Sequence, residues 1–155
     1  MSDTAIEVPD GFRPLPASSG FIAVNGPLYL RQTRREDGAA VVQIGFRVEP
    51  RHVNPMNNCH GGMVATFCDM LLPLSIHRLS AEVGQRFLVT INLQIDYLAA
   101  APLGAWVQGE AEVLRVTRTL VFSQGLVSAD GVPAVRVSGI FKIGQPFTGA
   151  IDPIG

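Results

Sequence analysis

The stretch that decides the fold reads N-P-M-N-N-C-H-G-G-M-V-A-T-F-C-D, from Asn54 to Asp69. It joins a polar loop to a His-Gly-Gly corner and then to an apolar run that continues to Ile76. In a helix of this sequence, apolar residues lie on every face, which predicts that the helix is buried on every side. We place it at about Gly62 to Leu79, with a kink at Pro73, because proline has no N–H to donate.

A single carboxylate, Asp69, interrupts the apolar run. Burying an unpaired carboxylate is costly, so its presence indicates either a partner or a chemical role. Gly61 and Gly62 stand at the helix start, where free N–H groups and the helix dipole favour an oxyanion. A carboxylate that activates water and a donor for an oxyanion are what a thioester or ester hydrolase needs. Asn54 adds a side chain that can position water or substrate.

Each of these residues also has a purely structural interpretation. Gly-Gly can be only a tight turn, Asp69 can cap a neighbouring loop, and His60 is more readily an organiser of the corner than a base. Cys59 beside His60 suggests a thiol nucleophile, but adjacent residues of an extended loop point apart. His52 and His77 are expected at the surface, and three scattered histidines predict no metal site.

The remaining sequence predicts strands joined by tight turns. Residues 86–98 alternate most clearly, which assigns one face to the core: Phe87, Val89, Ile91, Leu93, Ile95 and Tyr97. Asp37-Gly38 and Asp130-Gly131 are hairpin signals. Further strands are expected at 28–33, 39–48, 105–116, 119–129 and 134–143, with an irregular arm at 1–20 and a tail at 144–155. One long helix beside five or six mostly antiparallel strands is an α+β domain, and nothing divides 1–155 into two.

Composition excludes several classes of function. The formal net charge of −1 gives no basic field for nucleic acid. The apolar run is too short to span a bilayer and no signal peptide is visible, so we expect a cytoplasmic protein without a membrane partner. Charged residues are only 16% and apolar residues 47%, which favours a surface covered by a partner subunit. Two cysteines make no disulfide framework.

These residues together resemble the hotdog-fold acyl-CoA thioesterases of the phenylacetic-acid-pathway (PaaI-like) type. The resemblance covers about residues 40–143, and family members often carry glycine where this chain has Asn57 and Thr117. It rests on the spacing of Asn54, His60-Gly61-Gly62, Thr66 and Asp69, then V-T-I-N-L-Q-I-D-Y-L from Val89, the Pro102-Leu103-Gly104 turn and R-T-L-V-F from Arg118.

The resemblance implies a fold and an assembly. In a hotdog fold a curved antiparallel sheet wraps one long central helix. Such proteins form homodimers that usually pair into homotetramers, and each active site is shared between two subunits. The implied reaction is hydrolysis of an acyl-CoA to a carboxylic acid and CoA. No cofactor or metal is implied, because CoA is part of the substrate.

The resemblance also implies roles for single residues. Asp69 would act as general base or nucleophile, and the Gly61 N–H would polarise the thioester carbonyl. Asn54 and Thr90 would position the water. The residues expected to contact the substrate are His60, Gly62 and Arg118, the last of them near the CoA phosphates.

Two other functions compete with thioester hydrolysis. A hotdog enoyl-CoA hydratase or dehydratase would carry an Asp and a His a few residues apart, whereas His60 precedes Asp69 by nine positions here. A non-catalytic acyl-CoA or fatty-acid binding protein would have no need of the Asp69 carboxylate. The sequence does not identify the acyl group, so aromatic and medium-chain aliphatic groups are both candidates.

Overall fold

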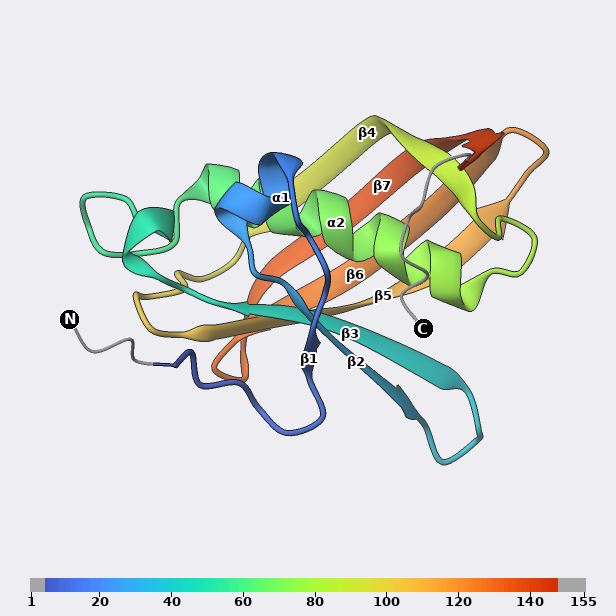
Figure 1. Ribbon diagram of the computed structural model, residues 1–155. Coiled ribbons are helices and arrows are strands. Elements are labelled where there is room, and N and C mark those ends of the chain that lie inside the picture. The colour runs from blue at the N-terminus through green and yellow to red at the C-terminus, as the bar shows by residue number, and fades with distance from the viewer. Residues whose placement is uncertain (1–4, 148–155) are drawn as a thin grey trace.

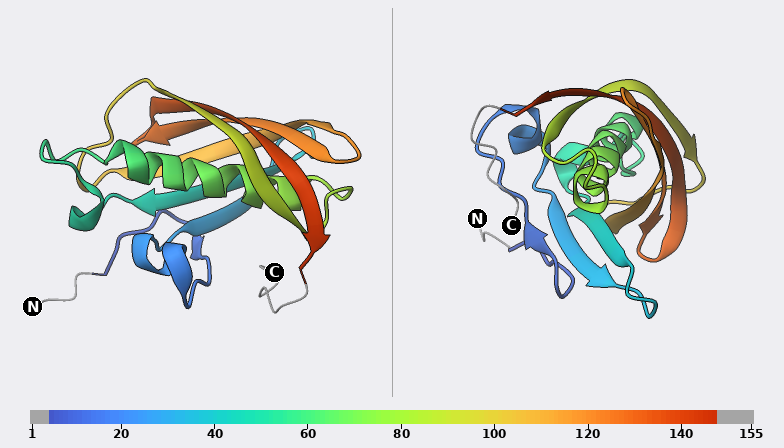
Figure 2. Two further views of the ribbon diagram at one scale, coloured as in Figure 1. Left: turned by 90° about the horizontal axis from the view of Figure 1, so that it is seen from above. Right: turned by 90° about the vertical axis from the view of Figure 1, so that its right-hand side faces the viewer.

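The computed structural model describes residues 5–147, in which an antiparallel sheet curves around one long helix, α2 (Gly61–Leu79). Figure 1 shows α2 lying across the sheet, and Figure 2 shows the sheet wrapping it when viewed along the helix. This arrangement confirms the predicted hotdog fold. The seven strands have the order β1-β2-β3-β5-β6-β7-β4, and every neighbouring pair is antiparallel. They are β1 (Arg13–Pro14), β2 (Tyr29–Arg34), β3 (Ala40–Arg47), β4 (Arg86–Tyr97), β5 (Trp106–Val116), β6 (Leu120–Ala129) and β7 (Val132–Pro146).

Both hairpins predicted from Asp-Gly pairs are confirmed. Gly38 turns the chain between β2 and β3 with a φ of 85°, a value that favours glycine. Asp130 (φ 46°) and Gly131 (φ 81°) turn the chain between β6 and β7. Two consecutive positive φ values are what a type I′ hairpin turn requires.

Two glycines on the inner face of the sheet let α2 approach closely. A Cβ built at Gly109 on β5 would lie 2.5 Å from Leu71 Cδ2, and one at Gly139 on β7 would lie 2.7 Å from Leu72 Cδ1. A larger side chain at either position would push the helix away from the sheet. The core between helix and sheet includes large, fully buried side chains: Phe46, Phe67, Phe141, Ile44, Leu71, Leu72 and Ile76.

The prediction that the central helix is buried on every side is wrong for the described chain. The sheet covers one side of α2 and leaves a stripe of partly exposed residues on the other, spaced three or four apart: Thr66, Asp69, Met70, Pro73 and His77. Residues at this spacing share one helix face. The helix continues through Pro73 to Leu79, although Pro73 offers no N–H to the Asp69 carbonyl.

The prediction for the faces of β4 is also wrong in its first half. Leu88 is buried (7% exposed), whereas Phe87 and Val89 are 50% and 45% exposed. The register shifts between Thr90 and Asn92, so that Ile91 is the extra residue of a β-bulge. A bulge reverses which residues face the core. The apolar alternation continues unchanged through Ile91, so the sequence gives no sign of the bulge.

The N-terminal arm is more regular than expected. Its short β1 pairs with β2 at the edge of the sheet, which raises the strand count above the five or six predicted. The arm is followed by a one-and-a-half-turn helix, α1 (Gly20–Asn25). At the other end β7 runs to Pro146, into the segment 144–155 predicted as a tail, while 148–155 and 1–4 lie outside the described residues. Within 5–147, no helix has the length and hydropathy needed to cross a bilayer.

Candidate active site

The start of α2 is held by His60, which occupies the N-cap position. Its Nδ1 atom accepts a 2.8 Å hydrogen bond from the Gly62 N–H, so His60 organises the corner as predicted. The Gly62 amide is thereby used within the cap. By contrast, the Gly61 N–H has no hydrogen-bond partner among residues 5–147. It remains available to a ligand at the positive end of the helix dipole.

The loop before this corner is organised by Asn54. Its Oδ1 atom accepts hydrogen bonds from the N–H groups of Met56 (3.0 Å) and Asn58 (3.2 Å). Asn57 between them has a φ of 58°, the left-handed conformation that glycine adopts most easily. The side-chain NH2 of Asn54 makes no hydrogen bond within the described part of the chain, so it can still donate to water or substrate.

His52 was predicted at the surface, and this prediction is wrong. Its side chain is 2% exposed and is satisfied at both ring nitrogens: Nδ1 accepts from the Glu49 N–H at 3.0 Å, and Nε2 lies 2.7 Å from the Asn25 carbonyl. Since a carbonyl only accepts, Nε2 carries the proton and the ring is neutral. Burial lowers the pKa of His52. Its own carbonyl accepts the His60 N–H at 2.8 Å, which joins His52 to the site.

Asp69 and Thr90 are brought together. The Thr90 hydroxyl donates a 2.7 Å hydrogen bond to Asp69 Oδ1, from the first half of β4 to the open stripe of α2. No Lys, Arg or His side chain within residues 5–147 forms an ion pair with Asp69. The carboxylate is half-buried, so it reaches solvent without being neutralised by a structural partner.

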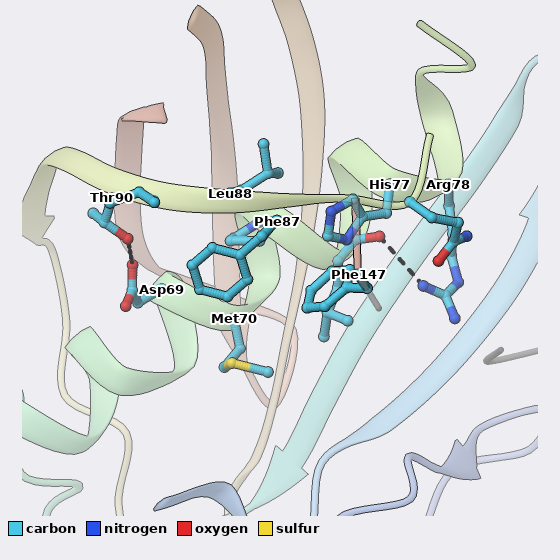
Figure 3. Close-up of a pocket in the computed structure, with 12 residues that line it drawn as sticks. Asp69, Met70, His77, Arg78, Phe87, Leu88, Thr90 and Phe147 are labelled. Carbon is cyan, nitrogen blue, oxygen red and sulfur yellow. Dashed lines mark hydrogen bonds between the residues drawn. The ribbon is translucent and has the colours of Figure 1, made fainter. Parts of the chain in front are cut away.

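Asp69 and Thr90 stand at one end of a pocket of about 430 Å³. Figure 3 shows Phe87 and Phe147 in its middle and His77 and Arg78 at the far end. His77, also predicted at the surface, is instead half-buried, and its Nε2 lies 2.8 Å from the Arg86 carbonyl. Burial lowers the pKa of His77. The remaining lining residues are Met70, Pro73, Leu74, Gln85, Leu88 and Val89.

Asn54 and Gly61 line a different hollow, of about 380 Å³, beside the start of α2. Gly61 precedes Asp69 by eight residues, which corresponds to about 12 Å along the helix. Within one chain, the Gly61 N–H and the Asp69 carboxylate are therefore far apart. Arg118 lies in the exposed turn between β5 and β6 and lines neither hollow.

Several residues of the site were missed in the sequence. The Tyr97 hydroxyl donates a 2.7 Å hydrogen bond to the Gly61 carbonyl, although the alternation had assigned Tyr97 to the core. The alternation likewise predicts Phe87 in the core, and Phe147 lies in the segment predicted as a tail. The phenol of Tyr97 indicates only that its hydroxyl needs a partner, and the apolar residues that follow it, Leu98 to Ala101, do not point to the Gly61 carbonyl.

The two thiols do not take part in this chemistry. Burial raises the pKa of Cys59 to about 11. Burial, with a further contribution from the Asp69 carboxylate, raises the pKa of Cys68 to about 12. Both thiols stay protonated near neutral pH and are poor nucleophiles. Among residues 5–147, no three His, Cys, Asp or Glu side chains gather closely enough to hold a metal ion.

Comparisons with known proteins place this chain in a family. A protein of Pseudomonas aeruginosa described as a candidate esterase is 27% identical over 138 residues, which cover 89% of this chain and 98% of that protein. Human acyl-coenzyme A thioesterase 13 is 32% identical over 78 residues, 50% of this chain and 54% of that protein, so the chain spans about half of its length.

A solved structure has the same fold. The hypothetical thioesterase of Streptococcus pneumoniae, crystallised with coenzyme A, superposes with a TM-score of 0.62 at 21% identity, over 77% of this chain and 88% of that one. Residues 56–134 match the family model described as the thioesterase superfamily, a range that includes the His-Gly-Gly corner, Asp69 and Thr90. The chain therefore belongs to the thioesterase superfamily.

Proposed function

We propose that this protein hydrolyses an acyl-CoA thioester to a carboxylic acid and CoA. The observation that carries the proposal is Asp69, a carboxylate at the wall of an apolar pocket whose described partner is a hydroxyl and not a cation. A structural carboxylate is normally paired with a positive charge or with several donors. A carboxylate held by one hydroxyl keeps lone pairs free to take a proton from water or to attack a carbonyl carbon.

The reaction follows from these groups. Asp69 takes a proton from a water oriented by Thr90, and the hydroxide attacks the thioester carbon; direct attack by Asp69 is the alternative. The carbonyl oxygen becomes an oxyanion that accepts a hydrogen bond from the Gly61 N–H, and Asn54 donates to water or to the thioester. The C–S bond then breaks, and the proton passes to the CoA sulfur.

Two subunits are needed for this reaction. Gly61 and Asp69 of one chain are about 12 Å apart along α2, too far to contact one thioester group. We therefore propose a homodimer in which Asp69 and Thr90 of one subunit face Gly61 and Asn54 of the other. The edge strand β4 offers an apolar surface for this contact, with Phe87, Val89 and Ile91 about half exposed. The homotetramer expected from the resemblance remains a prediction.

CoA as the carrier of the acyl group is supported by the relatives. Human acyl-coenzyme A thioesterase 13 is named for this substrate, and the Streptococcus pneumoniae protein was crystallised with coenzyme A. Arg118 stands in an exposed turn, where its guanidinium can meet the CoA phosphates at the surface. The pocket beside Asp69 is mainly apolar and would hold the acyl group.

The test is a panel of aromatic and aliphatic acyl-CoAs assayed for release of free thiol. Wild type should hydrolyse at least one of them, and Asp69→Asn should lower kcat by about a hundredfold or more. Asp96→Asn is the matched control, because Asp96 makes a surface ion pair with Arg136 and lies outside both hollows. Wild type and Asp69→Asn turning over the best substrate equally fast would refute the assignment, as would binding of acyl-CoA without any thiol release.

A further inference from the structure

Tyr97, the last residue of β4, ties the end of that strand to the start of α2. Its hydroxyl donates to the Gly61 carbonyl at 2.7 Å. Its ring also lies against Gly61, since a Cβ built at Gly61 would be 3.5 Å from the hydroxyl and 3.6 Å from two ring carbons. β4 therefore contacts the proposed machinery twice, through Thr90 at Asp69 and through Tyr97 at Gly61.

The hydroxyl of Tyr97 is not needed to hold β4 in the sheet. Tyr97 pairs with Val135 of β7 through the backbone, and the next residue, Leu98, donates its N–H to the Ala134 carbonyl at 2.8 Å. The side chain is 55% exposed, so its burial contributes little to the core. Its hydrogen bond to Gly61 thus acts on the helix start, not on the strand.

The helix start is where positioning matters. Gly61 is followed by Gly62, and two consecutive glycines leave the backbone unusually free. The neighbouring amides are fixed by other partners: His60 N–H by the His52 carbonyl, and Gly62 N–H by His60 Nδ1. The Gly61 N–H belongs to the His60–Gly61 peptide, whose carbonyl accepts from the Met63 and Val64 N–H groups. From outside the helix, Tyr97 holds the other side of Gly61, namely its carbonyl in the Gly61–Gly62 peptide.

We propose that Tyr97 is a positioning residue: it holds the Gly61 carbonyl and packs its ring against Gly61, which restricts rotation at the Gly61 Cα and keeps the N–H on the other side of that atom pointed at the thioester oxygen. This inference rests on the proposed function. An oxyanion donor is effective when it is oriented before the reaction, because no energy is then spent on turning it. Burial, with smaller contributions from Cys68 and Cys59, raises the pKa of Tyr97, so the phenol remains a donor throughout an ordinary assay range.

Tyr97→Phe tests the proposal, because it keeps the ring and removes only the hydroxyl. The matched control is Tyr29→Phe. Tyr29 is the other tyrosine of the chain and lies on β2, near the edge of the sheet opposite β4. Loss of a direct oxyanion donor costs about a hundredfold or more in kcat, so loss of its positioning should cost less, about tenfold. KM and the Kd of CoA alone should change by less than about twofold, and Tyr29→Phe should behave as wild type.

A double-mutant cycle separates positioning from a structural role. Gly61→Pro removes the N–H that Tyr97 is proposed to orient. In that background Tyr97→Phe should lower kcat by less than about twofold, since residues acting through one group are not additive. The same tenfold loss in both backgrounds would overturn the proposal, as would an unchanged kcat in Tyr97→Phe or a rise in KM alone.

Amide hydrogen exchange gives a readout that needs no activity. Exchange in residues 61–64 should be faster in Tyr97→Phe than in wild type, and unchanged in Tyr29→Phe. Unchanged exchange in Tyr97→Phe would remove the physical basis of the inference. If wild type released no thiol from any acyl-CoA, the proposed function would fail and the catalytic role of Tyr97 with it, while faster exchange would still establish the contact itself.

Discussion

Thr90 and Asp69 are 21 residues apart in the sequence and are joined by a 2.7 Å hydrogen bond. The contact exists because the bulge at Ile91 turns Thr90, and not Val89, toward the helix. Since the Thr90 hydroxyl donates to Oδ1, the other carboxylate oxygen faces no described donor. This hydrogen bond fixes the plane of the carboxylate while leaving an oxygen for the reaction.

Two substitutions of Thr90 separate the contribution of its hydroxyl to turnover from that of its side-chain volume. Thr90→Val keeps the volume and removes the donor, and we expect kcat to fall about tenfold or more, because hydrogen bonds to charged groups are worth about 1.5–3 kcal/mol. Thr90→Ser keeps the donor and should retain most of the activity. Steady-state thiol release by the two purified variants measures this difference. Equal rates for Ser and Val would show that the hydroxyl has no role in turnover.

The Gly61 N–H can be removed without breaking the helix. Gly61 is the first helical residue, where proline is well tolerated, and His60 already has the extended conformation (ψ 136°) that a residue before proline requires. Gly61→Pro should therefore fold and lower kcat by about a hundredfold. Gly61→Ala keeps the N–H, and its Cβ would meet Tyr97 at an ordinary 3.5 Å. It should lose much less, and a comparable loss in both variants would argue against an oxyanion role.

The proposed sharing of each site between two subunits predicts how mixed oligomers behave. Asp69→Asn and Gly61→Pro chains should each be inactive alone. A mixed dimer would rebuild one intact site, from Asp69 of one chain and Gly61 of the other. Random assembly of equal amounts should recover about a quarter of wild-type activity, and a dimer purified through two different tags should recover about half. No recovery in the doubly tagged dimer would place both groups of a site in one chain.

His52 should make stability depend on pH. Burial lowers its pKa in the folded state, so the unfolded chain binds more protons than the folded chain between that value and about 6.5. The free energy of unfolding should therefore fall as pH drops through this window, and His77 should act in the same direction. His52→Gln should be less stable at neutral pH but should show a shallower fall. Urea titrations at about pH 7.5 and 5.5 measure the free energy of unfolding of wild type and His52→Gln. An equal loss between the two pH values in both proteins would rule out His52 as a cause of the pH dependence.

The main elements of the fold could be predicted because local signals and the tertiary structure agree. Asp37-Gly38 and Asp130-Gly131 both form the hairpins they indicate. The phase of β4 could not be predicted, because inserting Ile91 changes the pairing with β7 without changing the apolar alternation. Edge strands can also expose apolar residues for a partner, so Phe87 resembles a core residue in the sequence.

Part of the candidate site could also be predicted from the sequence. Asp69 stood out since a charge in an apolar run is costly, and Thr90 followed from the resemblance. His52 and Tyr97 were not found because their roles depend on backbone carbonyls far away in sequence: those of Asn25 and Gly61. Side-chain partners leave a trace in residue type, whereas carbonyl partners leave none.

The glycines that seat the central helix have a consequence for how this protein can diversify. Gly109 and Gly139 set the spacing of helix and sheet, and neither lines the pocket beside Asp69. The pocket wall is drawn instead from Met70, Phe87 and Phe147, at the open margin of the structure. Substitutions along that margin can reshape the cavity while helix and sheet keep their spacing, so the ligand that the pocket accepts can change during evolution without a change of fold.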